Sequence, residues 1–171
     1  IIQIIRHYRT RRLRRFHPFQ RNTASRPRQP RENPAAMKPA NTMSYAELTE
    51  EVERLRRDKP DQVTCEVIPN HLFLNTDDYA QLGSRVQMNP PIRNPANASG
   101  LWSGLHQGII DIIATDHAPH TLAEKNQPYP NSPAGMPGVE TSLPLMLTAM
   151  QAGQCTLAQV QQWMCSGPAR V

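Results

Sequence analysis

The strongest constraint on the fold is a run of β-branched residues that ends in a cluster of ionisable side chains. Residues 109–113 read Ile-Ile-Asp-Ile-Ile, and an acid and two histidines follow, Asp116, His117 and His120. Such a run is typical of a strand buried on both faces, as in a parallel sheet. Because Pro119 interrupts regular structure, the ionisable cluster is predicted to lie just past the carboxyl end of that strand.

This position favours a functional site. In α/β barrels and in open α/β sheets, active sites lie at the carboxyl ends of the strands. The alternative is a strand end that carries a solvated aspartate and surface histidines. The residue pattern alone leaves both interpretations open.

The rest of the pattern predicts two βα units of a parallel sheet. A capping box at residues 44–47 opens a helix that ends by Pro60, and residues 63–67 follow as a strand. Residues 75–95 are predicted to be mostly loop, and a helix then leads into residues 109–113. Two helices close the chain: residues 143–150, and a helix capped by Thr156 whose predicted inward side chains are Leu157, Val160, Trp163 and Met164.

Cysteine usage and hydropathy restrict the setting. The three cysteines, Cys65, Cys155 and Cys165, are far apart and form no disulfide framework or zinc ribbon, which fits a reducing, cytoplasmic setting. No apolar run approaches the 18 residues that span a membrane, so we expect no membrane partner.

Four segments occur in an order and spacing that match one enzyme family. They are residues 63–72 (VTCEVIPNHL), 88–93 (MNPPIR), 115–120 (TDHAPH) and 132–141 (SPAGMPGVET). In that order they resemble strand seven, the loop after it, the end of strand eight and the following loop of dihydroorotases, in the amidohydrolase superfamily. The resemblance covers about residues 50–171. Because a complete (β/α)8 TIM barrel needs about 250 residues, it implies an α/β fold with only the last two or so βα units of the barrel.

The resemblance implies a reaction and a set of site residues. The family interconverts N-carbamoyl-L-aspartate and dihydroorotate in pyrimidine biosynthesis, with zinc as cofactor. It assigns Asp116 as metal ligand and catalytic general base, and it assigns substrate binding to Asn89, His120, Ala134 and Gly135.

The chemistry of these residue types agrees with those roles. A carboxylate that touches both a metal ion and its bound water can carry the proton in amide hydrolysis. Dihydroorotate is a small imide-like ring with a carboxylate, for which neutral donors and free N–H groups are suited. Gly135 allows close approach of the backbone.

Two further histidines lie near the ends of the predicted strands. His71, at the end of the first predicted strand, either positions a loop by hydrogen bonding or touches the substrate as a neighbour of the site. His117 is predicted to be structural, because alternate residues of a continuing strand point away from Asp116.

Most of the family's metal ligands have no counterpart in the sequence. A dihydroorotase site takes an H-x-H motif from strand one, an Asp or modified Lys from strand four, and histidines from strands five and six. The sequence contains no H-x-H, and its only histidines before residue 63 are His7 and His17. We therefore expect the chain alone to be inactive and to bind zinc weakly.

The amino-terminal segment differs from the rest of the chain. Residues 1–40 hold ten arginines and one lysine against one acid, for a net charge of +10, whereas residues 41–171 carry −5. Prolines and a lack of apolar residues after Phe19 predict a disordered arm over residues 1–43, followed by the barrel fragment over residues 44–171. The arm is interpreted as a nucleic-acid-binding arm, a solvated tail or the product of a shifted reading frame; the last is favoured, because the family-like sequence begins abruptly near residue 48.

Several other functions stay open. Within the superfamily, the alternative is a hydantoinase or allantoinase. Outside it, the alternative is a non-catalytic pseudo-dihydroorotase that scaffolds aspartate carbamoyltransferase or a homo-oligomer, or whose site a second chain completes. Nucleic-acid binding is disfavoured because the arm has no RNP, KH or helix-turn-helix pattern. Binding of nucleic acid by the arm predicts an affinity that falls steeply with salt, whereas a scaffold predicts salt-tolerant co-purification with its partner.

Overall fold

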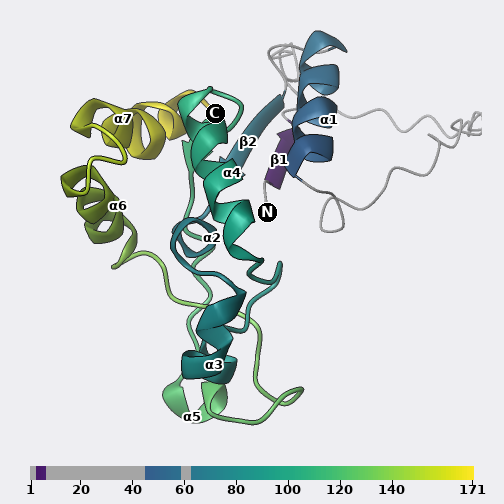
Figure 1. Ribbon diagram of the computed structural model, residues 1–171, viewed down its shortest axis with the longest axis vertical. Coiled ribbons are helices and arrows are strands. Elements are labelled where there is room, and N and C mark those ends of the chain that lie inside the picture. Colours follow the sequence, from purple (N-terminus) through teal and green to yellow (C-terminus); the bar gives the residue numbers. More distant parts are fainter. Residues whose placement is uncertain (1–2, 7–44, 59–62) are drawn as a thin grey trace, which may run out of the picture.

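The computed structural model describes residues 3–6, 45–58 and 63–171 (Figure 1). Its elements in chain order are β1 (Gln3–Arg6), α1 (Tyr45–Asp58), β2 (Val63–Val67), α2 (Pro69–Phe73), η2 (Thr76–Asp78), α3 (Tyr79–Leu82), η3 (Gly83–Val86), α4 (Pro95–His106), β3 (Ile112–Ile113), α5 (Leu122–Lys125), α6 (Ser142–Gln151), α7 (Leu157–Gln161), η4 (Gln162–Ser166) and η5 (Pro168–Arg170). The predicted cap residue Ser44 lies outside the described residues.

The parallel pairing of β2 with β3 confirms the predicted sheet. Glu66 pairs with Ile112 and Val67 with Ile113. Strand β3 is shorter than predicted, because the N–H groups of Ile109 and Ile110 bond to the carbonyl of Gly104 at the end of α4 rather than to the sheet. Ile112 and Ile113 point to opposite faces and are both buried, which confirms a strand covered on both sides.

The amino-terminal segment is corrected at four residues. The arm was predicted to be without structure, but Gln3–Arg6 pair antiparallel with β2, with Ile4 opposite Cys65. Strand β2 bonds to β3 along one side only, so its other side offers unpaired backbone groups to an extended, β-branched segment. The remainder of the predicted arm, residues 7–44, lies outside the described residues.

The segment between residues 75 and 95 is more helical than predicted. It contains η2, α3 and η3 in succession. The local cause is a capping box in which the Asn75 side chain accepts from the N–H of Asp77 and the Asp78 carboxylate accepts from the N–H of Asn75. The turns carry the chain from β2 to the loop of Asn89.

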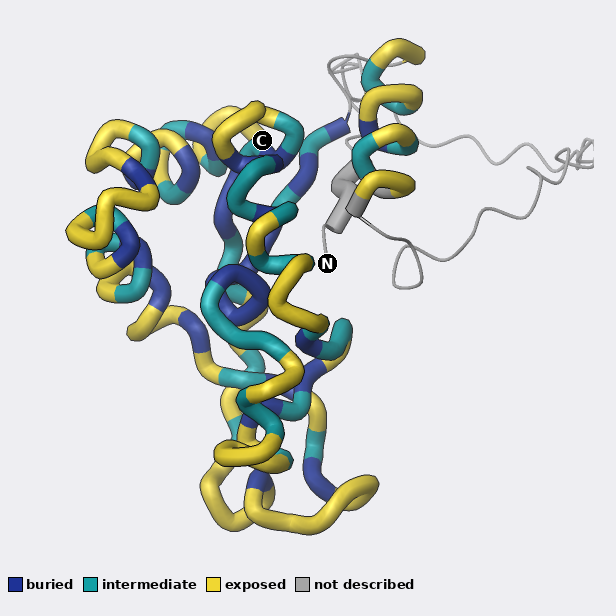
Figure 2. Tube along the Cα trace, in the orientation of Figure 1, coloured by how far each residue is buried: buried dark blue, intermediate teal, exposed yellow. Residues whose placement is uncertain are grey.

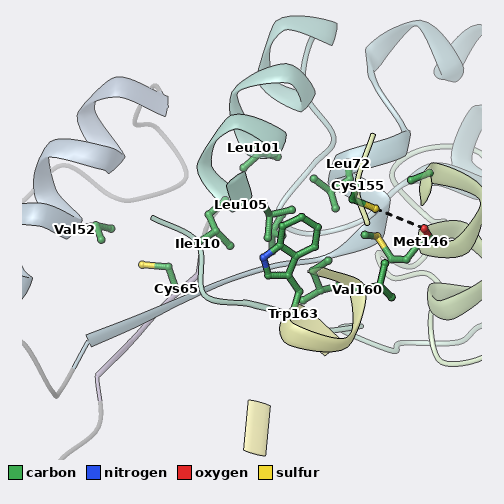
Figure 3. Close-up of a cluster of buried hydrophobic side chains, with 13 residues drawn as sticks. Val52, Cys65, Leu72, Leu101, Leu105, Ile110, Met146, Cys155, Val160 and Trp163 are labelled. Atoms are coloured by element: carbon green, nitrogen blue, oxygen red, sulfur yellow. Dashed lines mark hydrogen bonds between the residues drawn. The ribbon is translucent and has the colours of Figure 1, made fainter. Parts of the chain in front are cut away.

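The core lies between the sheet and the helices that flank it. Figure 3 shows Trp163 and Val160 directed toward Leu105 and Ile110. The inward direction predicted for Val160 and Trp163 is therefore confirmed, and Met164 is partly buried against the same cluster. Leu157 was predicted inward but is 62% exposed, because it begins α7 one turn before the helix reaches the core.

Burial is uneven along the molecule. In Figure 2 the buried residues gather along the central strands and the inner side of α4, whereas the end that carries α3 and α5 is largely exposed. Within the residues that the structure describes, no helix is long and apolar enough to cross a bilayer.

One carboxylate fastens α1 to the strands. The Asp111 carboxylate accepts a hydrogen bond from the backbone N–H of Cys65 at 2.7 Å, and it forms an ion pair with Arg56 of α1. Cys65 is buried, so its N–H has little access to water if this acceptor is lost. The contact therefore links the two strands and the preceding helix through one side chain.

Replacing Asp111 by Ala should lower the free energy of unfolding by about 1–3 kcal/mol, because it leaves a buried N–H and a partly buried guanidinium without their acceptor. Urea denaturation measures this change. The matched control is Asp58→Ala, which removes an exposed ion pair with Arg54 at 3.6 Å and should change stability by less than about 0.5 kcal/mol. Equal effects of the two substitutions would contradict the role of Asp111.

Candidate functional site

Asp116 follows β3 in an unusual backbone conformation. Its φ is 45°, in the left-handed region, where a non-glycine residue is uncommon and Asp is one of the tolerated types. Its side chain is exposed at the carboxyl end of the sheet, where the sequence predicted it. Residues held in sparsely populated conformations cluster at functional sites, which supports a role beyond packing.

A second carboxylate, which the sequence analysis did not single out, lies near Asp116. Glu66 on β2 is half-buried, and its pKa is raised above the usual range by burial and, to a lesser degree, by the negative charge of Asp116. Parallel pairing of β2 with β3 accounts for this proximity, since both residues then lie toward the same edge of the sheet.

The donor set around Asp116 does not fit a zinc pair. Among residues 3–6, 45–58 and 63–171, no group of three or more His, Cys, Asp or Glu side chains is placed to hold a metal ion. The described residues therefore supply at most part of such a centre, and no chemical step can be assigned to a metal from them.

His120, Ala134 and Gly135, to which the resemblance assigns substrate binding, lie close together. The Nε2 atom of His120 lies 3.2 Å from the carbonyl oxygen of Ala134. Gly135 has a φ of 137°, and a Cβ added there would lie 2.8 Å from Ala118 and 3.0 Å from Nε2 of His120. Any side chain at residue 135 would push this backbone away from the histidine, which explains why glycine is needed here.

Asn89 and Ala134 line one cavity of about 690 Å³. The wall also includes Gln87, Met88 and Tyr79, and neither Asp116 nor His120 lines it. The structure thus brings the two predicted substrate-binding loops together but places the predicted base outside this cavity.

A second cavity, of about 410 Å³, lies at the amino ends of the strands. It is lined by Thr64, His106 and Asp111, among others, and by none of the predicted site residues. The candidate site is therefore assigned to the carboxyl edge of the sheet.

His71 positions a loop, which is one of its two predicted roles. It is 5% exposed, and its Nε2 donates to the carbonyl of Pro90 at 3.1 Å, next to Asn89. Burial lowers the pKa of His71 to about 4, so the ring is neutral near pH 7. Its Nδ1 and the adjacent Asn70 Nδ2 are buried without a hydrogen-bond partner among the residues that the structure describes.

His117 has the structural role that was predicted for it. Its Nδ1 accepts hydrogen bonds from the N–H groups of Gly138 and Val139, at 3.0 and 3.2 Å. The histidine thereby fixes the loop that follows Gly135 against the end of β3.

Sequence reasoning also did not single out Lys125 and Gln87, which bond to the backbone of the loops that form the candidate site. Helix α5 is capped by reciprocal hydrogen bonds between Thr121 and Glu124. The burial of Lys125, the last residue of that helix, had no sequence signal, because lysine is almost never buried.

Comparison with known proteins identifies relatives of this arrangement. No family model matches the chain. The dihydroorotase of Halobacterium salinarum is 46% identical over 108 residues, which are 63% of this chain and 26% of that protein. The multifunctional protein CAD of Squalus acanthias is 41% identical over 125 residues, 71% of this chain and 5% of that protein. Over its matched residues, this chain is a homologue of dihydroorotases.

Solved structures agree with membership of the amidohydrolase superfamily. The L-hydantoinase (dihydropyrimidinase) of Arthrobacter aurescens has a TM-score of 0.64 and 32% identity, over 71% of this chain and 28% of that one. The dihydroorotase of Saccharomyces cerevisiae, in complex with 5-fluoroorotic acid, has a TM-score of 0.63 at 19% identity, over 75% and 35%, and shows the fold alone. This dihydroorotase homologue spans about a quarter of the length of the curated dihydroorotase it matches.

Stability should depend on pH through His71. Between about pH 6.5 and pH 4 the unfolded histidine binds a proton that the folded one does not, so stability falls as the pH falls through this window. The full loss should be about 3 kcal/mol. Urea denaturation between pH 4 and 7.5 measures it.

The substitution His71→Gln should flatten this pH dependence, whereas Gln151→Ala, at an exposed residue without a titrating group, should leave it intact. An unchanged slope in His71→Gln would contradict the assignment.

Proposed function

We propose that this chain contributes the substrate-binding edge of a dihydroorotase-type site, for the reversible cyclisation of N-carbamoyl-L-aspartate to dihydroorotate. The observation that carries the proposal is the convergence of the Asn89 loop with the Ala134–Gly135 backbone, which rests on His120. The 46% identity to a dihydroorotase over 108 residues supports the same reaction class. Zinc is the cofactor that the family implies.

The proposed contacts follow from the donors and acceptors present. The side-chain amide of Asn89 can both donate to and accept from an imide-like ring. Neutral His120 that donates through Nε2 to Ala134 offers the ligand only an acceptor at Nδ1. His120 therefore donates to a ligand only after it is protonated or after its contact with Ala134 opens.

Asp116 is proposed as the carboxylate that carries the proton and ligates the metal. Its place at the end of β3 and its left-handed backbone support this role. Because no cluster of donors accompanies it within the described ranges, the chain alone is proposed to be catalytically incomplete. The remaining ligands would then come from protein beyond these residues or from a second chain.

Purified chain with added zinc should not turn over dihydroorotate above the level of an Asp116→Asn variant. The physical reason is that the described residues offer no group of three or more side chains that could hold a zinc ion. Absorbance of the ring in the ultraviolet follows the reaction. Turnover by the unaltered chain that Asp116→Asn abolishes would contradict the incomplete site and leave the substrate assignment intact.

Binding tests the substrate assignment without turnover. Isothermal titration calorimetry with dihydroorotate should show affinity that falls about tenfold or more in Asn89→Ala and in His120→Ala, equivalent to about 1.4 kcal/mol per lost contact. Gln151→Ala, at an exposed residue of α6, is the control and should bind normally. Normal binding by both site variants would overturn the assignment.

The second candidate is a hydantoinase, which the likeness to the Arthrobacter aurescens L-hydantoinase favours. The same titration with hydantoin separates the two. Tighter binding of hydantoin than of dihydroorotate would favour the hydantoinase, and the reverse order would favour the dihydroorotase.

We also propose a protein partner. The similarity to a multifunctional protein is compatible with the scaffold hypothesis, in which the chain associates with aspartate carbamoyltransferase or with a second copy of itself.

A further inference from the structure

Lys125 is a buried cation placed behind the candidate substrate site. It ends α5 and is 5% exposed. Its Nζ donates to the carbonyl oxygens of Gln87 at 2.8 Å, Pro133 at 2.8 Å and Gly135 at 3.1 Å. An ammonium group has three N–H donors, so these contacts use all of them.

The charge of Lys125 has no carboxylate partner in the part of the chain that the structure describes. Burial without a counter-charge lowers the pKa of Lys125. All three partners are acceptors, however, and only the protonated amine satisfies them together. Transfer of a charge from water into a buried environment without a counter-charge is unfavourable. Neutral hydrogen-bonding groups would connect the same loops with a smaller desolvation penalty.

The three carbonyls belong to the two loops that form the candidate site. Gln87 lies two residues before Asn89, and Pro133 and Gly135 flank Ala134. One ammonium therefore holds both loops. In Figure 1, α5 lies beside α3 at the end of the molecule away from α1, where these loops meet.

Gln87 completes the connection. Its carbonyl accepts from the N–H of Gly135 at 3.1 Å as well as from Lys125, and its side-chain amide donates to the carbonyl of Ser132 at 3.0 Å. The spacing between Asn89 and Ala134 across the cavity thus depends on a small network centred on one oxygen atom.

We propose that Lys125 is a positioning residue of this site, whose ammonium group fixes the Gln87–Asn89 loop against the Pro133–Gly135 loop and so sets the shape in which a dihydroorotate-like ring is bound. The inference rests on the proposed function for the identity of the ligand. The connection of the two loops by the ammonium stands on the contacts alone.

Three variants of the full chain separate charge from packing. Lys125→Met keeps most of the length of the side chain and removes the ammonium, and Lys125→Arg keeps a cation with several donors. Ser132→Ala is the matched control, because Ser132 is buried and its hydroxyl donates to the carbonyl of Lys125 without touching the ammonium. It perturbs the same helix end through a different atom.

Two measurements are made on each variant. Amide hydrogen exchange of Gly135, whose N–H bonds to Gln87, should be at least tenfold faster in Lys125→Met than in Ser132→Ala, with Lys125→Arg between Lys125→Met and the unaltered chain. The affinity for dihydroorotate, measured by calorimetry, should fall at least tenfold in Lys125→Met and be partly restored in Lys125→Arg.

The outcomes separate the two claims. Unchanged Gly135 exchange in Lys125→Met, or an equal acceleration in Ser132→Ala, overturns the positioning role. Faster exchange with unchanged affinity for dihydroorotate also overturns it, because the fixed spacing would not matter to the ligand. If the unaltered chain binds no dihydroorotate, the proposed function fails, and Gly135 exchange alone then decides whether Lys125 connects the loops.

Discussion

The parallel pairing of β2 with β3 is the constraint on which the candidate site depends. It brings the carboxyl ends of two strands to one edge, so the loops that leave them meet although some 45 residues separate Asn89 from Ala134 in the sequence. At the other end of the same strands, Asp111 fastens the sheet to α1. One end of the sheet is therefore fixed by a carboxylate, and the other presents loops with polar groups.

These loops are held by polar side chains around them, of which His71 and Lys125 are buried. His71 holds Pro90, His117 holds the N–H groups of Gly138 and Val139, and Lys125 holds carbonyls from both loops. Each contact binds backbone rather than another side chain. The arrangement leaves the side chains of Asn89 and Asp116 exposed while the backbone that carries them is fixed, as a binding site requires.

The sequence predicted the features that depend on local patterns. The strand at residues 63–67 and the strand after residue 109 both follow from nearby residues, and the structure confirms them. The pairing of β1 with β2, the short length of β3 and the burial of Lys125 could not be predicted in this way. Each depends on which backbone groups tertiary structure leaves without a partner, and composition gives no sign of that.

The central claim is that the loops at the carboxyl edge of the sheet bind a dihydroorotate-like ring. The most direct measurement is a titration of ¹⁵N-labelled chain with dihydroorotate, followed by amide chemical shifts. The account predicts saturable shifts at Asn89 and at Ala134 and Gly135, with little change at Thr64 and His106, which line the cavity at the other end. No shifts at the first three residues, or larger shifts at the second cavity, would contradict it.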